Sequence, residues 1–160
     1  MGAERYDVVV IGAGIHGAGI AQAAAAGGYT VLLLEQHAPA FGTSSRSSKL
    51  IHGGLRYLET GQLALVRECL RERELLLKLA PDLVRLVPFY IPVYRDTTRR
   101  PWQIRAGLSL YALLGGLGEH VRFTRVPRPQ WGELDGLVTR DLQAVYRFFD
   151  AQSGDAALTR

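Results

Sequence analysis

A glycine-rich turn between two apolar runs constrains the fold of this chain more than any other feature. The run 6–11 is apolar and β-branched, which predicts a buried parallel strand, and it leads directly into the sequence GAGIHG at 12–17. The Ala-rich stretch 18–26 predicts a helix that ends at a Gly pair, and 30–34 predicts a second buried strand. This order of strand, turn, helix and strand indicates an α/β fold built on a Rossmann-like βαβ unit.

The three glycines of the turn suit a dinucleotide. Gly12 permits the tight turn, Gly14 lets a pyrophosphate approach the backbone, and Gly17 lets the helix lie close to the strand. Bare amides at the helix start then face the phosphates, and the helix dipole favours their negative charge. Glu35 lies 21 residues beyond Gly14, where a carboxylate can accept both ribose hydroxyls of an adenosine and repels a 2′-phosphate. The alternative is a βαβ unit that binds no dinucleotide and has glycines only because its turn is tight.

A second segment, 42–59, carries a different signal. Between Gly42 and Gly54 it holds five hydroxyl residues, two basic residues and a Gly pair. Each hydroxyl can donate to an oxygen, so this composition suits a segment that lies along a phosphate-containing ligand. An ordinary Ser-rich surface loop has the same composition, and the residues alone leave both interpretations open.

The sequence of this segment, SSKLIHGGLRYLE, resembles the FAD-dependent glycerol-3-phosphate dehydrogenases. The similarity continues through RERELLLKLAPDLV, RPWQIRAGLSLYALLGG and VYRFFDAQSGDAALT, and so covers nearly the whole chain. The resemblance implies a glutathione-reductase-like FAD-binding fold, FAD as cofactor and oxidation of sn-glycerol 3-phosphate to dihydroxyacetone phosphate. It implies a membrane quinone as electron acceptor, although a subset of relatives are oxidases that use oxygen.

The resemblance also implies which residues bind. Contacts with FAD fall to Gly12, Gly14, Gly17, Glu35, Gln36, Thr43, Ser44, Ser47, Ser48, Lys49, Leu50, His52, Gly53 and Gly54. Arg56 and Tyr57 face the substrate, and a guanidinium suits a phosphate dianion, although a surface ion pair is the plainer role for Arg56. His52 either moves a proton or only hydrogen-bonds the flavin ring, so no catalytic base is named.

After Glu35 the sequence supplies none of the further parallel strands that a nucleotide-binding sheet needs. Two parallel strands with one helix rarely stand alone, because parallel sheets are covered on both faces. We therefore expect an incomplete enzyme that is inactive by itself. Residues 1–83 would form the N-terminal part of an FAD-binding domain, and 84–160 the first part of an α+β substrate domain.

The rest of the chain predicts further elements. An amphipathic helix is expected over 62–80, with Leu63, Val66, Leu70 and Leu77 on one side and a Glu74–Lys78 pair on its surface. Two prolines in the apolar run 84–94 suit an edge strand or two short strands. We expect a helix over 101–114, a loop over 119–136, a strand over 144–150 and the start of a helix over 155–160.

Charge and composition indicate which classes of binding partner suit this chain. The net charge of +4 includes a cluster at Arg95, Arg99, Arg100 and Arg105, which suits an anionic substrate or membrane surface. No nucleic-acid motif, metal-ligand spacing or signal peptide is recognised, and the single cysteine, Cys69, fits a reducing compartment. We expect a cytoplasmic protein, peripheral on the inner face of the cytoplasmic membrane, and a homodimer when intact.

Two other functions compete with a flavin-linked oxidoreductase. The glycine turn alone also allows an NAD-dependent dehydrogenase, against which the segment GTSSRSSKLIHGG argues. A non-catalytic remnant that holds nucleotide weakly, or not at all, would explain the missing strands. Failure of a folded sample to bind FAD would favour the remnant.

Overall fold

The computed structural model describes residues 5–160 and divides them into two compact units. Unit 1 contains residues 5–50 and 153–160, and unit 2 contains 51–152. These limits differ from the domain boundary that we expect after residue 83, which concerns the domains of an intact enzyme and stays a prediction. The residues expected to bind FAD are therefore divided between the units, with 12–50 in unit 1 and 52–54 in unit 2.

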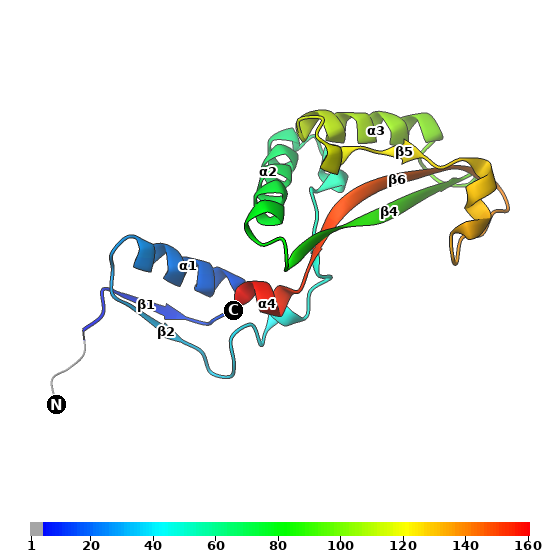
Figure 1. Cartoon of the computed structure of the whole chain (residues 1–160). Coiled ribbons are helices and arrows are strands. Elements are labelled where there is room, and N and C mark those ends of the chain that lie inside the picture. Colours follow the sequence, from blue (N-terminus) through cyan, green and yellow to red (C-terminus); the bar gives the residue numbers. More distant parts are fainter. Residues whose placement is uncertain (1–4) are drawn as a thin grey trace. The chain divides into compact units, whose positions relative to one another are not determined.

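Unit 1 is the predicted βαβ unit. Strand β1 (Val8–Ile11) runs parallel to β2 (Val31–Leu34), and helix α1 (Ile15–Ala26) connects them and packs on both, as Figure 1 shows. A 3₁₀ helix, η1 (Thr43–Ser45), and a final helix, α4 (Asp155–Thr159), complete the unit, and α4 packs against η1 and α1. The parallel pairing and the crossover helix confirm the fold class predicted from the glycine turn.

Helix α1 contains the predicted stretch 18–26 and starts at Ile15, because the glycine turn closes within three residues of β1. One detail of this unit differs from the prediction. The strands are less buried than predicted. Of the eight residues in β1 and β2, all of which the structure describes, only Val10 is buried, and Ile11 is 86% exposed. Helix α1 covers one face of a two-stranded sheet, which leaves most apolar side chains of β1 and β2 in contact with solvent.

Unit 2 is built on a sheet with the strand order β3-β6-β4, and β5 also pairs with β6. The strands are β3 (Leu50–Ile51), β4 (Val84–Tyr94), β5 (Thr124–Arg125) and β6 (Leu142–Ser153). Strand β4 ends the order, which confirms the edge-strand alternative and suits its two prolines, since proline cannot donate to a ladder. Strand β6 is longer than predicted because it has neighbours on both sides.

Helices α2 (Leu63–Leu79) and α3 (Pro101–Leu114) pack on this sheet close to the predicted positions. Alternate residues of β6, including Tyr146 and Phe148, join both helices in one apolar core. Val145 points to the other face, where it packs with Trp131. The predicted surface pair is confirmed, since Lys78 Nζ lies 3.4 Å from Glu74 Oε1.

The segment 119–136, predicted as a loop, contains three short elements. They are the 3₁₀ helices η3 (Glu119–Val121) and η4 (Arg128–Glu133), with β5 between them. The prediction was wrong because buried side chains lie among the prolines and charges: Val126 donates its amide to Val145, and the Trp131 indole donates to the carbonyl of Val126. Local composition does not reveal such long-range partners.

Candidate functional site

The glycine turn of unit 1 has the geometry that its sequence predicts. Gly12 has φ +100°, a conformation that side chains disfavour, and its amide donates to the Leu34 carbonyl over 2.7 Å, which ties the turn to β2. A Cβ atom on Gly17 would overlap the carbonyl oxygen of Gly12. The helix can therefore approach the strand this closely only with glycine at position 17.

Glu35 lies at the end of β2 and reaches back to this turn. Its Oε2 accepts the Ala13 amide at 2.8 Å, and its Oε1 accepts the His37 amide at 3.0 Å. These two backbone hydrogen bonds, that of Ala13 first, hold the pKa of the Glu35 carboxyl below its ordinary value. Glu35 therefore stays ionised near neutral pH, and the neighbouring Gln36 is exposed.

The hydroxyl-rich segment begins against the start of α1. Ser44, in η1, accepts the Ile15 amide on its Oγ at 2.9 Å, and a Cβ atom on Gly14 would lie 3.3 Å from the same oxygen. The prediction of bare amides at the helix start is therefore wrong at Ile15, because Ser44 accepts there. Thr43 belongs to the same 3₁₀ helix and is exposed.

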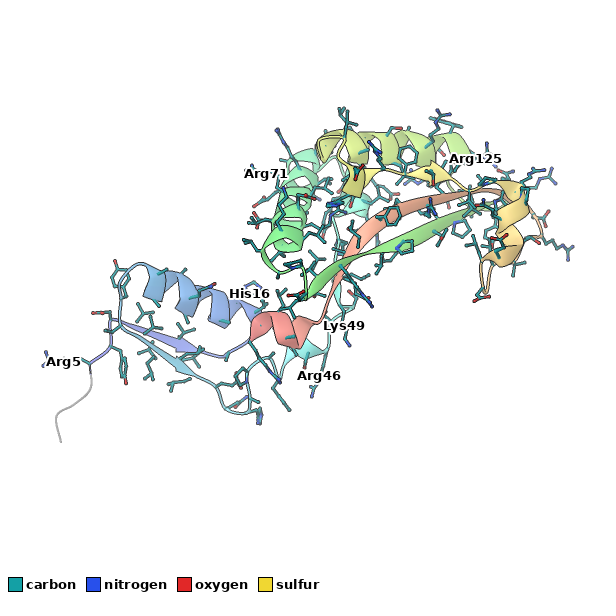
Figure 2. All side chains as sticks on the ribbon, in the orientation of Figure 1. Arg5, His16, Arg46, Lys49, Arg71 and Arg125 are labelled. Carbon is teal, nitrogen blue, oxygen red and sulfur yellow. The ribbon has the colours of Figure 1, made fainter. Side chains whose placement is uncertain are left out.

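The next residues of this segment are exposed and held by backbone contacts. Ser47 Oγ accepts the Lys49 amide at 2.8 Å, and Lys49 has φ +59°. The Lys49 carbonyl accepts the Ser153 amide at 2.9 Å, which fixes the end of the segment to the residue before α4. Ser48 is exposed, and Leu50 is half-buried in β3. Figure 2 shows Arg46 and Lys49 extending from this segment, and the Arg46 guanidinium lies 5.0 Å from the Phe41 ring centroid.

Within unit 2, a buried ion pair holds the segment His52–Gly53–Gly54. The Gly53 amide donates to Asp150 Oδ1 at 3.2 Å, and the same oxygen lies 2.8 Å from an Arg73 nitrogen. The Arg73 side chain is 1% exposed and that of Asp150 7%. His52 itself is exposed, and Gly54 has φ +71°.

Arg73 and Asp150 are not among the site residues that the sequence predicts. A signal was present, because Arg73 lies three residues after Leu70 and four before Leu77, on the apolar side predicted for α2. A charged residue at such a position is rarely buried without a partner. Asp150 ends the predicted strand 144–150, but nothing in the sequence connects it to α2.

Arg56 and Tyr57 lie together in a 3₁₀ helix, η2 (Leu55–Leu58), directly after Gly54. Both side chains are exposed, and Arg56 lines a pocket of about 370 Å³ between η2 and α3. Arg99 and Glu59 line the same pocket and form an ion pair of 3.1 Å. The pocket thus has a cationic guanidinium at Arg56, as recognition of an anion requires.

Comparison with known proteins identifies the family. The family model described as FAD dependent oxidoreductase matches residues 7–160. The chain belongs to this family. A glycerol-3-phosphate dehydrogenase of Pseudomonas aeruginosa is 58% identical over 113 residues, which are 71% of this chain and 22% of the relative. Glycerol-3-phosphate dehydrogenase 2 of Mycobacterium bovis is 45% identical over 163 aligned positions, which cover 99% of this chain and 27% of the relative.

The chain spans about a quarter of the length of the curated relatives that it matches. Solved structures share the fold. A glycerol-3-phosphate dehydrogenase from Bacillus halodurans, complexed with FAD, superposes with a TM-score of 0.61 at 24% identity, over 99% of this chain and 24% of that one. An L-α-glycerophosphate oxidase from Mycoplasma pneumoniae, with FAD bound, gives a TM-score of 0.70 at 16% identity, over 98% of this chain and 41% of that one.

The residues present fit FAD, the cofactor of this family. Glycine at position 17 lets α1 start directly at the turn, where a helix N-terminus can face a pyrophosphate, and the ionised Glu35 lies beside that turn. Family membership favours FAD over the NAD-dependent alternative. Over residues 5–160, each helix is too short or too polar to cross a bilayer.

Proposed function

We propose that this chain belongs to a flavoprotein that oxidises sn-glycerol 3-phosphate to dihydroxyacetone phosphate. The observation that carries the proposal is the 45% identity, over 99% of the chain, to a relative named glycerol-3-phosphate dehydrogenase 2. The glycine turn and the segment 42–59 lie within that coverage. When bound, FAD supplies the hydride acceptor.

In unit 1, the proposed FAD contacts follow the glycine turn. Gly12 and Gly17 form the tight turn and its close helix packing, and Gly14 would let a pyrophosphate approach the backbone at the start of α1. Glu35 would accept the ribose hydroxyls, since each carboxylate oxygen has a further lone pair beside the one that its backbone amide occupies. Gln36 would contact the same ribose.

The remaining proposed FAD contacts follow along the chain. The pyrophosphate and ribityl chain would lie along Thr43, Ser44, Ser47, Ser48, Lys49 and Leu50. Among them, Lys49 supplies a cation and the seryl hydroxyls supply donors. His52, Gly53 and Gly54 would face the flavin ring, where two glycines leave room for a planar group.

Arg56 is the proposed phosphate-binding residue for the substrate, with Tyr57 beside it. A guanidinium presents parallel N–H donors that match two oxygens of a phosphate. Its position in the 370 Å³ pocket supports this role, because the pocket also contains the polar side chain of Gln103. Arg99 is already paired with Glu59, which leaves Arg56 as the stronger candidate in this pocket.

A direct test uses the purified chain, FAD and glycerol 3-phosphate. The chain is incubated with FAD, excess is removed, and visible absorption is recorded before and after glycerol 3-phosphate is added. We expect retained flavin that glycerol 3-phosphate does not bleach, because the incomplete chain is expected to be inactive by itself. Binding of glycerol 3-phosphate should still shift the flavin absorption bands, and Arg56→Gln should weaken this shift whereas Arg71→Gln, on the exposed surface of α2, should not. A folded but colourless sample would contradict the proposed cofactor site in this chain, and glycerol acting as well as its phosphate would contradict the role of Arg56.

We further propose attachment to the inner face of the cytoplasmic membrane through α3. Trp102 and Leu113 on this helix are 69% and 61% exposed, and Arg105 is exposed near its start. Apolar side chains beside an arginine suit an anionic lipid surface. Vesicles containing anionic lipid should therefore sediment the chain better than neutral ones, and Trp102→Ser should weaken this binding. The quinone acceptor and the homodimer are proposed from the resemblance alone.

A further inference from the structure

The buried pair Arg73–Asp150 has no role in the function proposed above. Removing two charges from water is costly, and an apolar pair of similar volume often gives equal or greater stability. In addition, the Arg73 Nε is buried without a hydrogen-bond partner in the structure. The pair is therefore weak evidence for stability and calls for another explanation.

The contacts of Arg73 show what the pair holds. One of its nitrogens donates to Asp150 Oδ1 at 2.8 Å and to the Phe149 carbonyl at 3.2 Å, and it lies 3.4 Å from the Tyr111 hydroxyl. The other donates to the His120 carbonyl at 3.2 Å. A single side chain on α2 thus binds β6, α3 and η3.

Asp150 extends this network to the segment that carries His52. Its Oδ1 accepts the Gly53 amide as well as the Arg73 donor. A Cβ atom on Gly53 would overlap the Tyr111 hydroxyl and the Leu70 side chain, so the backbone at Gly53 lies directly against the network. Burial raises the pKa of Tyr111, which therefore stays a neutral hydroxyl beside the pair.

We propose that Arg73 and Asp150 are positioning residues whose ion pair fixes the backbone of His52, Gly53 and Gly54 for the flavin. Asp150 holds the Gly53 amide, and Arg73 holds Asp150 in the orientation that does so. Because Gly54 is a left-handed turn that leads directly into η2, the position of Gly53 also determines where Arg56 lies, two residues after Gly54. This inference rests on the proposed function, which places the same three residues against the flavin ring.

The decisive variant is Arg73→Met/Asp150→Leu, which removes both charges and keeps the volume. If the pair were merely structural, this double variant would restore thermal stability and FAD affinity together. If the pair positions Gly53, the double variant restores thermal stability but not the acceptor of the Gly53 amide. We expect this amide to exchange its hydrogen about tenfold faster than in the unmodified chain. We also expect the dissociation constant for FAD to rise about tenfold.

Two further variants control the experiment. Arg73→Lys keeps the charge that Asp150 needs, so we expect it to keep most of the Gly53 protection and FAD affinity, and it decides the outcome if the double variant does not fold. Arg71→Met lies two positions away on α2, and its side chain points outward in Figure 2. It should leave both measurements unchanged.

Gly53 exchange is measured without FAD, so the two proposals can fail separately. An unmodified chain that binds no FAD would contradict the FAD site proposed in this chain, while Gly53 exchange would still report whether the pair holds the segment. Unchanged Gly53 protection in the double variant would overturn the positioning role. So would a double variant that loses this protection but binds FAD as tightly as the unmodified chain.

Discussion

The substitution Gly17→Ala, which adds one methyl group, tests whether α1 must lie as close to the glycine turn as the structure shows. Gly17→Ala places a Cβ atom against the Gly12 carbonyl oxygen, so the helix must move away from the turn. We expect a loss of about 1–3 kcal/mol in the free energy of unfolding and weaker FAD binding. Urea unfolding and flavin fluorescence measure the two effects.

Gly19→Ala is the matched control on the same helix. A Cβ atom there meets no atom within 4 Å, and alanine favours a helix by about 0.5–1 kcal/mol over glycine. The two substitutions should therefore change stability in opposite directions. Equal effects would show that α1 does not need to approach the turn so closely.

The Glu74 carboxylate on α2 predicts a dependence of stability on acid. His120 Nδ1 lies 2.8 Å from Glu74 Oε2, and this hydrogen bond is the main cause that lowers the Glu74 pKa from its ordinary value of 4.5. Because the folded pKa lies below the unfolded one, the stabilisation is present above pH 4.5 and is lost as pH falls through the folded pKa. Both side chains are partly exposed, so the effect should stay below about 1 kcal/mol.

Glu74→Gln removes this contribution, so the variant should lose less stability than the unmodified chain between about pH 6 and pH 3.5. Glu72→Gln, an exposed neighbour on α2, should behave like the unmodified chain. Chemical unfolding at both pH values gives the comparison. Parallel pH profiles for Glu74→Gln and the unmodified chain would show that the contact with His120 is not maintained in solution.

Among the elements, those with a local signal were predicted well. The glycine turn, the period of α2 and the Pro and Gly boundaries of α3 all act within a few residues, and the structure confirms these helices. The short strand β5 was missed because its ladder depends on Tyr146 and Arg147, more than twenty residues later. Burial of β1 and β2 was overestimated for a related reason, since a strand's composition does not state what covers it.

The candidate site shows the same division. The turn glycines, Glu35 and the segment 42–59 can be found by motif and spacing, and the structure brings Ser44 and Glu35 to the turn within unit 1. The Arg73–Asp150 pair joins residues 77 positions apart, so its geometry emerges only from the packed fold. An arginine on an apolar helix face was the one local indication.

The hydrogen bonds at the start of α3 lead to a prediction about the stability of this helix. Pro101 occupies the first turn, and the Gln103 side chain accepts the Arg100 amide at 2.8 Å, which satisfies a donor that a helix start otherwise leaves unpaired. Gln103→Ala should therefore cost about 0.5–1 kcal/mol of stability, whereas Gln103→Glu should keep the acceptor and gain from the helix dipole. Thermal unfolding distinguishes the two. A stable alanine variant would mean that this cap contributes nothing.

For the whole molecule, the contrast between the two units predicts where the chain opens first. Unit 2 has a buried core drawn from α2, α3, β4 and β6, whereas Val10, Ala13 and Ala40 are the buried apolar residues among those described in unit 1. Local opening is cheapest where few apolar contacts hold the backbone. Amides of β1 and β2 should therefore exchange with deuterium at least about tenfold faster than those of β6 at 144–150.

Ligand binding sharpens this last prediction. A ligand that binds the folded unit stabilises it by about 2.7 kcal/mol when its free concentration is one hundred times its dissociation constant. Saturating FAD should therefore slow exchange in β1 and β2, which carry the glycine turn, and the Gly17→Ala variant should show a smaller protection. Equal exchange in the two units without FAD would contradict the predicted order of opening. Protection that FAD confers only on β6 would place its binding energy outside the glycine turn, because unit 1 would then gain nothing from the ligand.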